Sequence, residues 1–549
     1  MKIKNSMISG VMLLLTSFTT GCKDFLEEDL KSQLAPTNTF TSTYGFEVGS
    51  AGLYALTRSE YNTWGEGSAF MHGNATPYEA LQAATDIVDV INSDASLTAF
   101  ANLTLTAEEQ FVASYWNWAY SLVASANEIL MFSEINDNWD RPSDKDRFQA
   151  EARFFRAYAY RTLVYLYGDV PYVETIQYDF QLNFSRTPKA EVLQHIIDDL
   201  KFASEHLPEN PDQVEDGKLT KWAAYHLLSE MYLLQKEYPL AEEAALAVIN
   251  SGYFELMEER FGVSADMPGD VFSDLFKENN QNRTRGNRES IWVLQFEFNA
   301  IGGGSNSDDW TRRAWSPMYF NINGFVLADT LGGRGLAQIV PMKWWVGTNG
   351  TNATGNVPGI FDATDIRNSN YNIKRNWYYN NASNALYGGK ANITEQTWFS
   401  TKTLFPALTK FFYGRTEDLA LTGSYRDRMK FRLAETYLFL AEAYLGQGDA
   451  FRALAADAVN EVRRRAKAQP VNASNMTLDF LLDERIRELV GEESRRFTLV
   501  RTGTFVDRIK AYNTTIKDRV NNNHALWPIP QAIRDANRDA EFPQNPGYR

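Results

Sequence analysis

Residues 221–256 read KWAAYHLLSEMYLLQKEYPLAEEAALAVINSGYFEL, and this stretch decides the fold. Its aromatic and small side chains have the spacing of a tetratricopeptide repeat, in which two antiparallel helices pack closely across a short turn. The positions that carry the pattern are Tyr225, Leu228, Ser229, Tyr232, Tyr238, Ala241 and Ala245. The stretch therefore predicts one helical hairpin of a repeat scaffold.

A second copy of the pattern occupies residues 432–462, which read RLAETYLFLAEAYLGQGDAFRALAADAVNEV. The matching positions are Tyr437, Leu440, Ala441, Tyr444, Gly448, Asp449 and Ala453. Apolar residues at helical spacing also predict helices over residues 115–132, 147–167 and 189–206. Because one such hairpin cannot bury its apolar face alone, we expect the hairpins to stack into a mostly α-helical scaffold.

Between the two copies, residues 298–400 are rich in Asn and Gly and show no long amphipathic pattern. Tryptophans are nevertheless concentrated from Trp292 to Trp398, whereas disordered segments are poor in aromatic residues. We therefore expect a long, ordered, irregular region with little β structure, seated on the helical scaffold. Loops held on a rigid frame are where binding residues gather, so this region is the predicted binding face.

The beginning of the chain has the features of a secretory signal peptide. Lys2 and Lys4 precede the mostly apolar residues 8–15, and small residues follow up to Gly21. Cys22 is the only cysteine, so it cannot form an internal disulfide or supply a thiolate metal site by itself. We expect cleavage after Gly21 and lipidation of Cys22. The alternative, an ordinary signal peptide followed by an incidental cysteine, stays open.

Charge and motif content argue against several classes of function. The formal net charge of −15 makes the chain a poor partner for nucleic acid. No phosphate-binding loop, dinucleotide fingerprint, HExxH or GxSxG motif occurs, and His226 is expected in the core of a repeat. Residues 484–503 mix both charge signs, which predicts a salt-bridged packing surface. We expect no catalytic residue, no metal site and no cofactor; calcium is possible but has no motif.

Aromatic residues in the irregular region are candidates for ligand contact. Trp and Tyr present a flat apolar face with a polar edge, which can stack on a sugar ring or on a peptide side chain. The candidates are Trp310, Trp315, Tyr319 and Trp344, and core packing is the alternative for each of them. Trp344 and Trp345 are adjacent, so either of them can be the core residue. Asp308 and Asp309 beside Trp310 keep a glycosidase carboxylate pair open as another alternative.

Several blocks, in this order, resemble the SusD/RagB family of nutrient-binding outer-membrane lipoproteins from Bacteroidetes. Residues 151–173, EARFFRAYAYRTLVYLYGDVPYV, resemble the helix that runs into a G-D-V-P turn. The two repeat blocks follow, and then DERIRELVGEESRRFTLVRTG at residues 483–503. Residues 526–548, LWPIPQAIRDANRDAEFPQNPGY, carry the W-P-I-P and Q-N-P-G-Y elements. Together the blocks extend over most of the chain.

The resemblance implies a function that periodicity alone does not. It implies a protein without enzymatic activity that captures an oligosaccharide at the cell surface and delivers it to a SusC-like TonB-dependent transporter. Some members of the family capture peptides instead. Ligand sites of the family draw on two regions, and the matching positions here are Asp86, Asp89, Phe100 and Asn102 in the first and Trp310, Trp315 and Tyr319 in the second.

The expected organisation is a lipoprotein signal peptide at residues 1–21 followed by one SusD-like body at residues 22–549. Its parts are a tether with the first binding loops at 22–110, helical repeats at 111–290, the loop-rich ligand-binding region at 291–425, and a helical repeat with the C-terminal tail at 426–549. The expected location is the outer membrane, with a lipid on Cys22 as anchor and the body facing the cell exterior.

Overall fold

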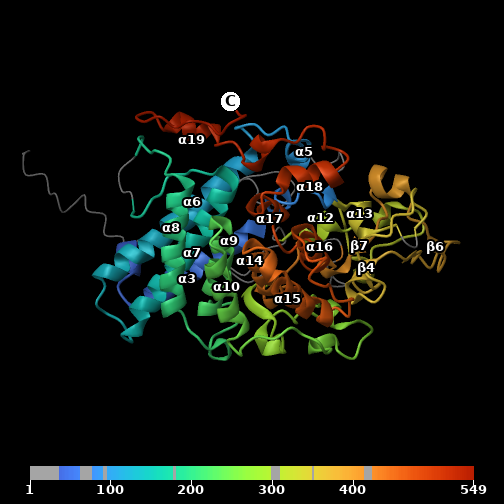
Figure 1. Cartoon of the computed structure of the whole chain (residues 1–549), viewed down its shortest axis with the longest axis horizontal. Helices are drawn as coiled ribbons and strands as arrows, with labels where there is room; N and C mark the ends of the chain where they lie inside the picture. The colour runs from blue at the N-terminus through green and yellow to red at the C-terminus, as the bar shows by residue number, and fades with distance from the viewer. Residues whose placement is uncertain are drawn as a thin grey trace, which may run out of the picture.

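The structure of the chain is a computed structural model that describes residues 36–61, 77–90, 95–176, 181–297, 309–348, 351–412, 419 and 423–549. The expected signal peptide, Cys22 and Asp308 lie outside these residues. Helices fill one side of the molecule, and a loop-rich region with short strands forms the other (Figure 1). The prediction of a mostly α-helical protein with minor β structure is confirmed.

The helical side is built from hairpins that follow one another along the chain, and each helix packs on the next. These helices are α6 (Gln110–Ile135), α7 (Ser143–Tyr167), α8 (Lys189–His206), α9 (Lys221–Gln235) and α10 (Tyr238–Ile249). The three helices predicted from apolar spacing correspond to α6, α7 and α8. Gly168 ends α7 with a φ of 74°, a conformation that glycine adopts without steric cost.

The two predicted repeats lie side by side in space, because α14 (Leu433–Gly446) packs against α10 and against α15 (Arg452–Arg465). A Cβ atom added at Gly446 would lie 2.3 Å from the ring of Tyr238, so the absence of a side chain permits this close approach. His226 on α9 is buried, and its Nδ1 lies 2.9 Å from Thr436 Oγ1 on α14. The prediction that His226 is a core residue is confirmed.

The loop-rich region is inserted between the two strands of one antiparallel pair. The chain leaves the scaffold through β2 (Ser290–Leu294) and returns through β8 (Arg428–Arg432), which leads directly into α14. We call residues 295–427 the insertion. Three further antiparallel pairs involve it: β1 (Val88–Asp89) with β3 (Val340–Pro341), β4 (Ile373–Lys374) with β7 (Ala407–Leu408), and β5 (Trp377–Tyr378) with β6 (Lys390–Ala391).

Further helices complete the fold around these two parts. Those that precede the insertion are α2 (Pro36–Thr39), α3 (Thr43–Arg58), α4 (Pro77–Ala80), α5 (Ala95–Asn102) and α11 (Val271–Asp274). The insertion contains α12 (Thr311–Trp315) and α13 (Lys343–Val346). The C-terminal ones are α16 (Leu478–Leu489), α17 (Arg495–Arg501), α18 (Phe505–Tyr512) and α19 (Gln531–Ala536).

A buried charge network fastens the insertion to the scaffold. It consists of Asp365 and Arg367 in the insertion and of Glu289, Arg432, Arg465, Glu484 and Glu488 outside it. The Arg367 guanidinium lies 2.8 Å from Glu484 and 3.0 Å from Glu488, and Arg465 lies 2.9 Å from Glu289. These side chains are fully buried, so each charge depends on its partners, because an unpaired buried charge is costly.

The pKa of Glu484 reflects this environment. Burial alone would raise it, but the guanidinium groups of Arg367, Arg487 and Arg463 outweigh that effect and lower it to about 2. Arg485 and Arg501 in residues 484–503 also form buried ion pairs, with Glu435 and Glu442. The prediction of a salt-bridged packing surface in this segment is therefore confirmed.

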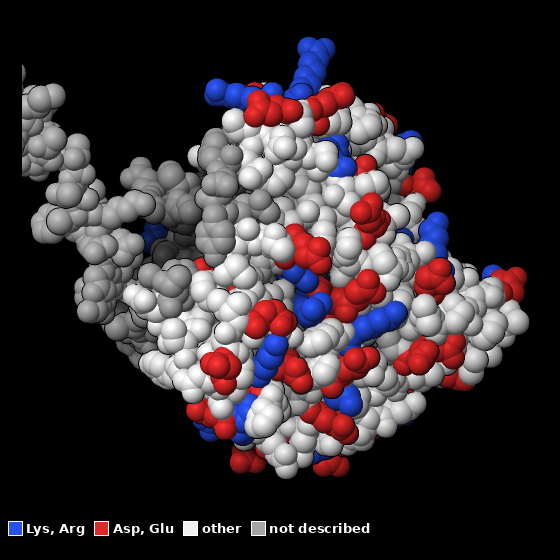
Figure 2. Space-filling view, turned by 90° about the vertical axis from the view of Figure 1, so that its left-hand side faces the viewer, with Lys and Arg blue, Asp and Glu red and all other residues white. Residues whose placement is uncertain are grey.

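The outer surface of the helical side carries mixed charge. Figure 2 shows that acidic and basic side chains alternate over this face, without one continuous basic area. Exposed pairs of the kind found on such surfaces, for example Arg464 with Glu461 at 2.7 Å, contribute little to stability. Loss of one partner is therefore expected to cost far more in the buried network than in an exposed pair.

Candidate functional site

A cavity of about 450 Å³ lies where the insertion meets the C-terminal helices, and we call it the Trp344 pocket. Its wall is formed by Asp89, Met342, Lys343, Trp344, Val357, Glu395, Phe399, Tyr512 and Thr514. These residues come from β1, α13, α18 and loops between them, so the fold alone brings them together. A cavity of this size with aromatic walls and few polar groups has the usual character of a small-molecule site.

Trp344 and Tyr512 stack on each other in the pocket. Their ring centroids are 4.0 Å apart, and the ring planes differ by 24°. Trp344 Nε1 donates a hydrogen bond of 2.7 Å to the backbone oxygen of Asp86, which fixes the orientation of the indole. Both side chains are half-buried, so one part of each ring remains accessible. A flat, rigid, partly polar surface of this kind suits a sugar ring, because few rotamers are lost on binding.

The side chain of Asp86 supports this aromatic surface from behind. Its carboxylate is fully buried and forms ion pairs with Arg495 at 2.8 Å and with Arg508 at 2.9 Å. The Arg508 guanidinium in turn lies 4.3 Å from the Tyr512 ring centroid and 5.3 Å from that of Trp344. Burial raises the pKa of Asp86, but the two guanidinium groups outweigh it and lower the pKa below its usual value. Asp86 therefore positions the pocket and does not itself reach a ligand.

Asp89 is the predicted residue that places a carboxylate in the same pocket. It is half-buried, its backbone pairs with Val340 across β1 and β3, and it accepts a hydrogen bond of 3.1 Å from Thr515 Oγ1. Burial raises its pKa above the usual value. Lys343 and Glu395 add a positive and a negative group to the wall of the same pocket, where they form an ion pair. Acceptors and donors for sugar hydroxyls thus stand beside the aromatic surface.

Three predicted ligand residues lie in the core instead. Phe100 packs with its ring centroid 4.9 Å from that of Trp527, and Trp315 stacks on Phe411 at 5.1 Å. Tyr319 stacks on Trp377 at 5.7 Å. Each of the three predicted side chains is 3% exposed or less, so none can stack on a ligand in this structure. The error has a physical cause: glycine-rich loops still need a core, and large aromatic side chains supply it.

Two predicted residues remain partly exposed but outside the Trp344 pocket. Asn102 ends α5, and its side-chain oxygen lies 3.5 Å from an Arg519 nitrogen. Trp310 precedes α12, and the Arg313 guanidinium lies 4.4 Å from its ring centroid. The structure therefore brings together Asp89 and Trp344 among the predicted residues and places Asn102 and Trp310 elsewhere.

The structure also answers which of two adjacent tryptophans is the core residue. Trp345 is fully buried and donates a hydrogen bond of 2.6 Å to the backbone oxygen of Ile87, whereas Trp344 lines the pocket. Tyr512 and Phe399 were missed by sequence reasoning. The signal for Tyr512 was weak: an aromatic residue at the end of an amphipathic helix, followed by Asn513, Thr514 and Thr515.

In the described parts of the chain, no group of three or more His, Cys, Asp and Glu side chains could hold a metal ion. Asp309, one member of the carboxylate pair considered above, is ion-paired with Arg428 at 3.0 Å. None of the described helices combines the length and the apolar character needed to cross a bilayer.

Comparisons with known proteins give a consistent result. The family model described as "Starch-binding associating with outer membrane" matches residues 58–233, and the model described as "SusD family" matches residues 288–548. SusD-like protein P25 of Formosa agariphila is 25% identical over 563 residues, with 96% of each chain covered. The starch-binding protein SusD of Bacteroides thetaiotaomicron is 25% identical over 463 residues, covering 79% of this chain and 78% of that protein.

A solved structure shows the same fold. It is surface glycan-binding protein A of Bacteroides thetaiotaomicron in complex with laminarihexaose, which is 20% identical to this chain. The TM-score is 0.69, and the alignment covers 91% of this chain and 98% of the other. The described residues therefore share the fold of this solved structure.

Proposed function

The chain belongs to the SusD family, and from this premise we propose that it is a cell-surface lipoprotein that binds a glycan and delivers it to a SusC-like TonB-dependent transporter. The proposal names oligosaccharide as the ligand class, the outer membrane as the location and binding without catalysis as the activity. Two kinds of observation support it: the family of the chain and the chemistry of the Trp344 pocket.

The observation that carries the glycan assignment is the stacked pair of Trp344 and Tyr512 beside the carboxylate of Asp89. Sugar rings have apolar faces and a rim of hydroxyl groups, so an aromatic surface with adjacent hydrogen-bonding groups matches both parts. Laminarihexaose is the ligand of the solved relative described above. For this chain it is the first probe to try.

The proposed anchor is a lipid on Cys22, which lies outside the described residues. Cleavage after Gly21 would leave Cys22 as the first residue, and the segment up to α2 would serve as a tether. A lipid chain inserts into one leaflet without any transmembrane helix. Changing Cys22 to Ala should release the protein from the outer membrane; retention of the variant at the cell surface would contradict the anchor.

The ligand site is tested by calorimetry with Trp344→Ala. We expect the dissociation constant for a bound oligosaccharide to rise about tenfold, which corresponds to about 1.4 kcal/mol. The matched control is Tyr387→Ala, which removes an aromatic side chain that is 61% exposed and outside the pocket. Equal affinities for the two variants would remove Trp344 from the site. Laminarihexaose and maltohexaose serve as probes.

Peptide capture and catalysis are the two alternatives. A peptide pool that binds through Trp344 while glycans do not would favour a peptide-capturing member of the family. The glycosidase alternative has one supporting observation: burial raises the pKa of Asp89, whereas the pKa of Glu395 in the same pocket is lowered, with burial opposed by hydrogen bonds from Lys343 and Thr354. Incubation of the protein with glycans and measurement of new reducing ends separates binding from hydrolysis.

A further inference from the structure

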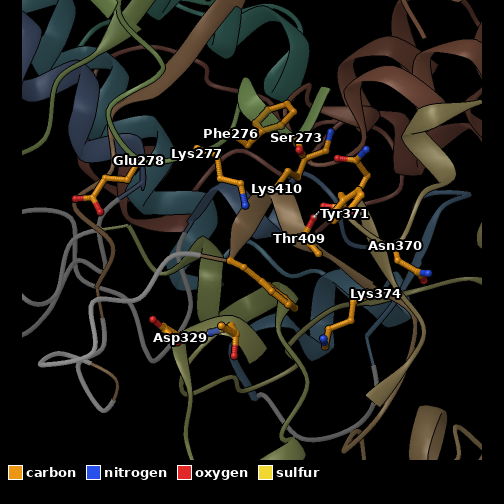
Figure 3. A pocket seen from close by; sticks show the side chains of 13 residues that line it. Ser273, Phe276, Lys277, Glu278, Asp329, Asn370, Tyr371, Lys374, Thr409 and Lys410 are labelled. Atoms are coloured by element: carbon orange, nitrogen blue, oxygen red, sulfur yellow. Dashed lines mark hydrogen bonds between the residues drawn. The ribbon is translucent and has the colours of Figure 1, made fainter. Parts of the chain in front are cut away.

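A second cavity, of about 530 Å³, opens on the insertion, and we call it the lysine pocket (Figure 3). It is lined by Ser273, Phe276, Lys277, Glu278, Asp329, Thr330, Asn370, Tyr371, Asn372, Lys374, Thr409, Lys410 and Phe412. We propose that this pocket is a second ligand site, which binds the negatively charged substituent of an acidic saccharide. The substituent is a carboxylate or a sulfate ester.

Two ammonium groups on the wall of the pocket have no carboxylate partner in the described part of the chain. Among the described residues, no Asp or Glu lies within ion-pair distance of Lys277 or Lys374. Figure 3 shows the two side chains entering the hollow from different sides. A charged group that is not neutralised inside the protein is available for a ligand of opposite charge.

Lys374 is held in place by the fold. It lies on β4, its backbone pairs with Ala407 on β7, and its Nζ is 5.3 Å from the Trp377 ring centroid. The side chain is half-buried, and burial lowers its pKa. The half-buried ammonium group has lost part of its hydration, and an anion beside it would compensate for that loss. The interaction free energy with an anion is therefore more favourable here than on an open surface.

The third lysine of the pocket has a structural role. Lys410 is buried, its Nζ lies 2.6 Å from Glu492 Oε1, and the ring centroids of Phe276 and Phe272 are 5.0 and 5.4 Å away. It therefore closes the inner wall and does not compete for the ligand. Phe276 and Phe412 add apolar surface, which suits the face of a sugar ring.

The balance of charge distinguishes the two pockets. Apart from Lys410, which is paired with Glu492, the lysine pocket carries two Lys against Glu278 and Asp329, which gives 2 − 2 = 0 in a chain whose formal net charge is −15. The Trp344 pocket carries Lys343 against Asp89 and Glu395, which gives 1 − 2 = −1. An anionic group is therefore repelled less from the lysine pocket than from the Trp344 pocket, and it can pair with the ammonium groups of Lys277 and Lys374, whereas a neutral sugar has no such preference.

The test uses the double variant Lys277→Met and Lys374→Met in the full chain. Its control, Lys236→Met with Lys467→Met, removes the same charge from two exposed lysines at helix ends. Calorimetry with trigalacturonate, a sulfated carrageenan tetrasaccharide and neutral laminarihexaose measures each dissociation constant. We expect the dissociation constant of an anionic probe to rise at least tenfold in the pocket variant and to stay the same in the control variant. The dissociation constant of laminarihexaose should be unchanged in both variants.

The two anionic probes separate the two sources of negative charge, and binding of either one through the lysines supports the proposal. Three results would overturn it: no binding of either anionic probe to the unchanged protein, equal affinities in the pocket variant and the unchanged protein, or an equal loss in the control variant. The inference rests on the proposed function only in taking the ligand to be a saccharide. Its failure is separable, because laminarihexaose binding and its loss in Trp344→Ala do not involve either lysine.

Discussion

The scaffold and the insertion solve the problem of burying apolar surface in different ways. In the scaffold, each helix covers its neighbour, so the same spacing of small and aromatic residues recurs in α9 and α14. The insertion has short strands and few helices, and its buried tryptophans, Trp315, Trp345, Trp377 and Trp398, form a core without any repeat. The comparison teaches that the two parts have different roles. The periodic helices give the scaffold its shape, whereas the irregular insertion, which is joined to the scaffold by buried ion pairs, supplies most of the pocket walls.

The strongest way to break this arrangement is to remove a charge from the junction. Arg367→Ala leaves Glu484 and Glu488 buried without their partner from the insertion, and we expect a loss of about 3–5 kcal/mol in the free energy of unfolding. Arg464→Ala, in α15, removes an exposed arginine side chain and should cost about 0–1 kcal/mol. Chemical denaturation of both variants measures the difference. Similar losses for the two would show that the buried network does not hold the parts together.

Acid should weaken the same junction. The pKa of Glu484 is lowered from 4.5 to about 2 in the folded chain, so its contribution is complete above about pH 4.5 and is lost as the pH falls toward 2. The shift corresponds to about 3 kcal/mol of stability. Denaturation midpoints between pH 7 and pH 2 measure the loss, and Glu484→Gln should flatten the curve. If the denaturation midpoint of Glu484→Gln fell with pH as steeply as that of the unchanged protein, Glu484 would not be the group responsible.

The contact between the two repeats can be tested with one methyl group. Gly446→Ala places a Cβ 2.3 Å from the Tyr238 ring, and we expect a loss of about 1–3 kcal/mol because the helices must separate. Gly52→Ala in α3 has open space around the new Cβ and should stabilise the protein by up to about 1 kcal/mol. Thermal unfolding of both variants gives the sign of each effect. A stabilised Gly446 variant would mean that the repeats do not pack as described.

The smallest expected effect concerns the polar side of the Trp344 pocket. Burial raises the pKa of Asp89, so its carboxylate should gain a proton at a higher pH than an exposed Asp. Oligosaccharide affinity should therefore fall by a few fold as the pH drops through that pKa, and Asp89→Asn should remove the dependence. Calorimetry from pH 7 to pH 4 measures it. A pH dependence that persists in the variant would assign the titration to another group.

Sequence reasoning succeeded where the pattern is local. The spacing in residues 189–206 predicts α8 at its observed bounds, and the two repeats were identified from positions within single hairpins. It failed where the outcome depends on contacts between distant segments. Nothing near Trp315 indicates that Phe411 will cover it, and nothing near Trp344 indicates that Tyr512 will stack on it.

The same reason explains the outcome for the predicted carboxylates. Asp86 and Asp89 are three residues apart and have similar surroundings in sequence. Asp86 is neutralised by Arg495 and Arg508, more than 400 residues away, whereas Asp89 opens onto the pocket. The lysine pocket has four chain segments in its wall, from α11 to Phe412, and no single stretch of sequence could have indicated it.

The crystal structure of the chain with a bound oligosaccharide tests the central claim most directly. The account predicts a sugar ring against the accessible part of the stacked Trp344–Tyr512 pair, with a hydroxyl group within hydrogen-bonding distance of Asp89. A ligand bound elsewhere on the molecule, with the Trp344 pocket empty, would contradict it.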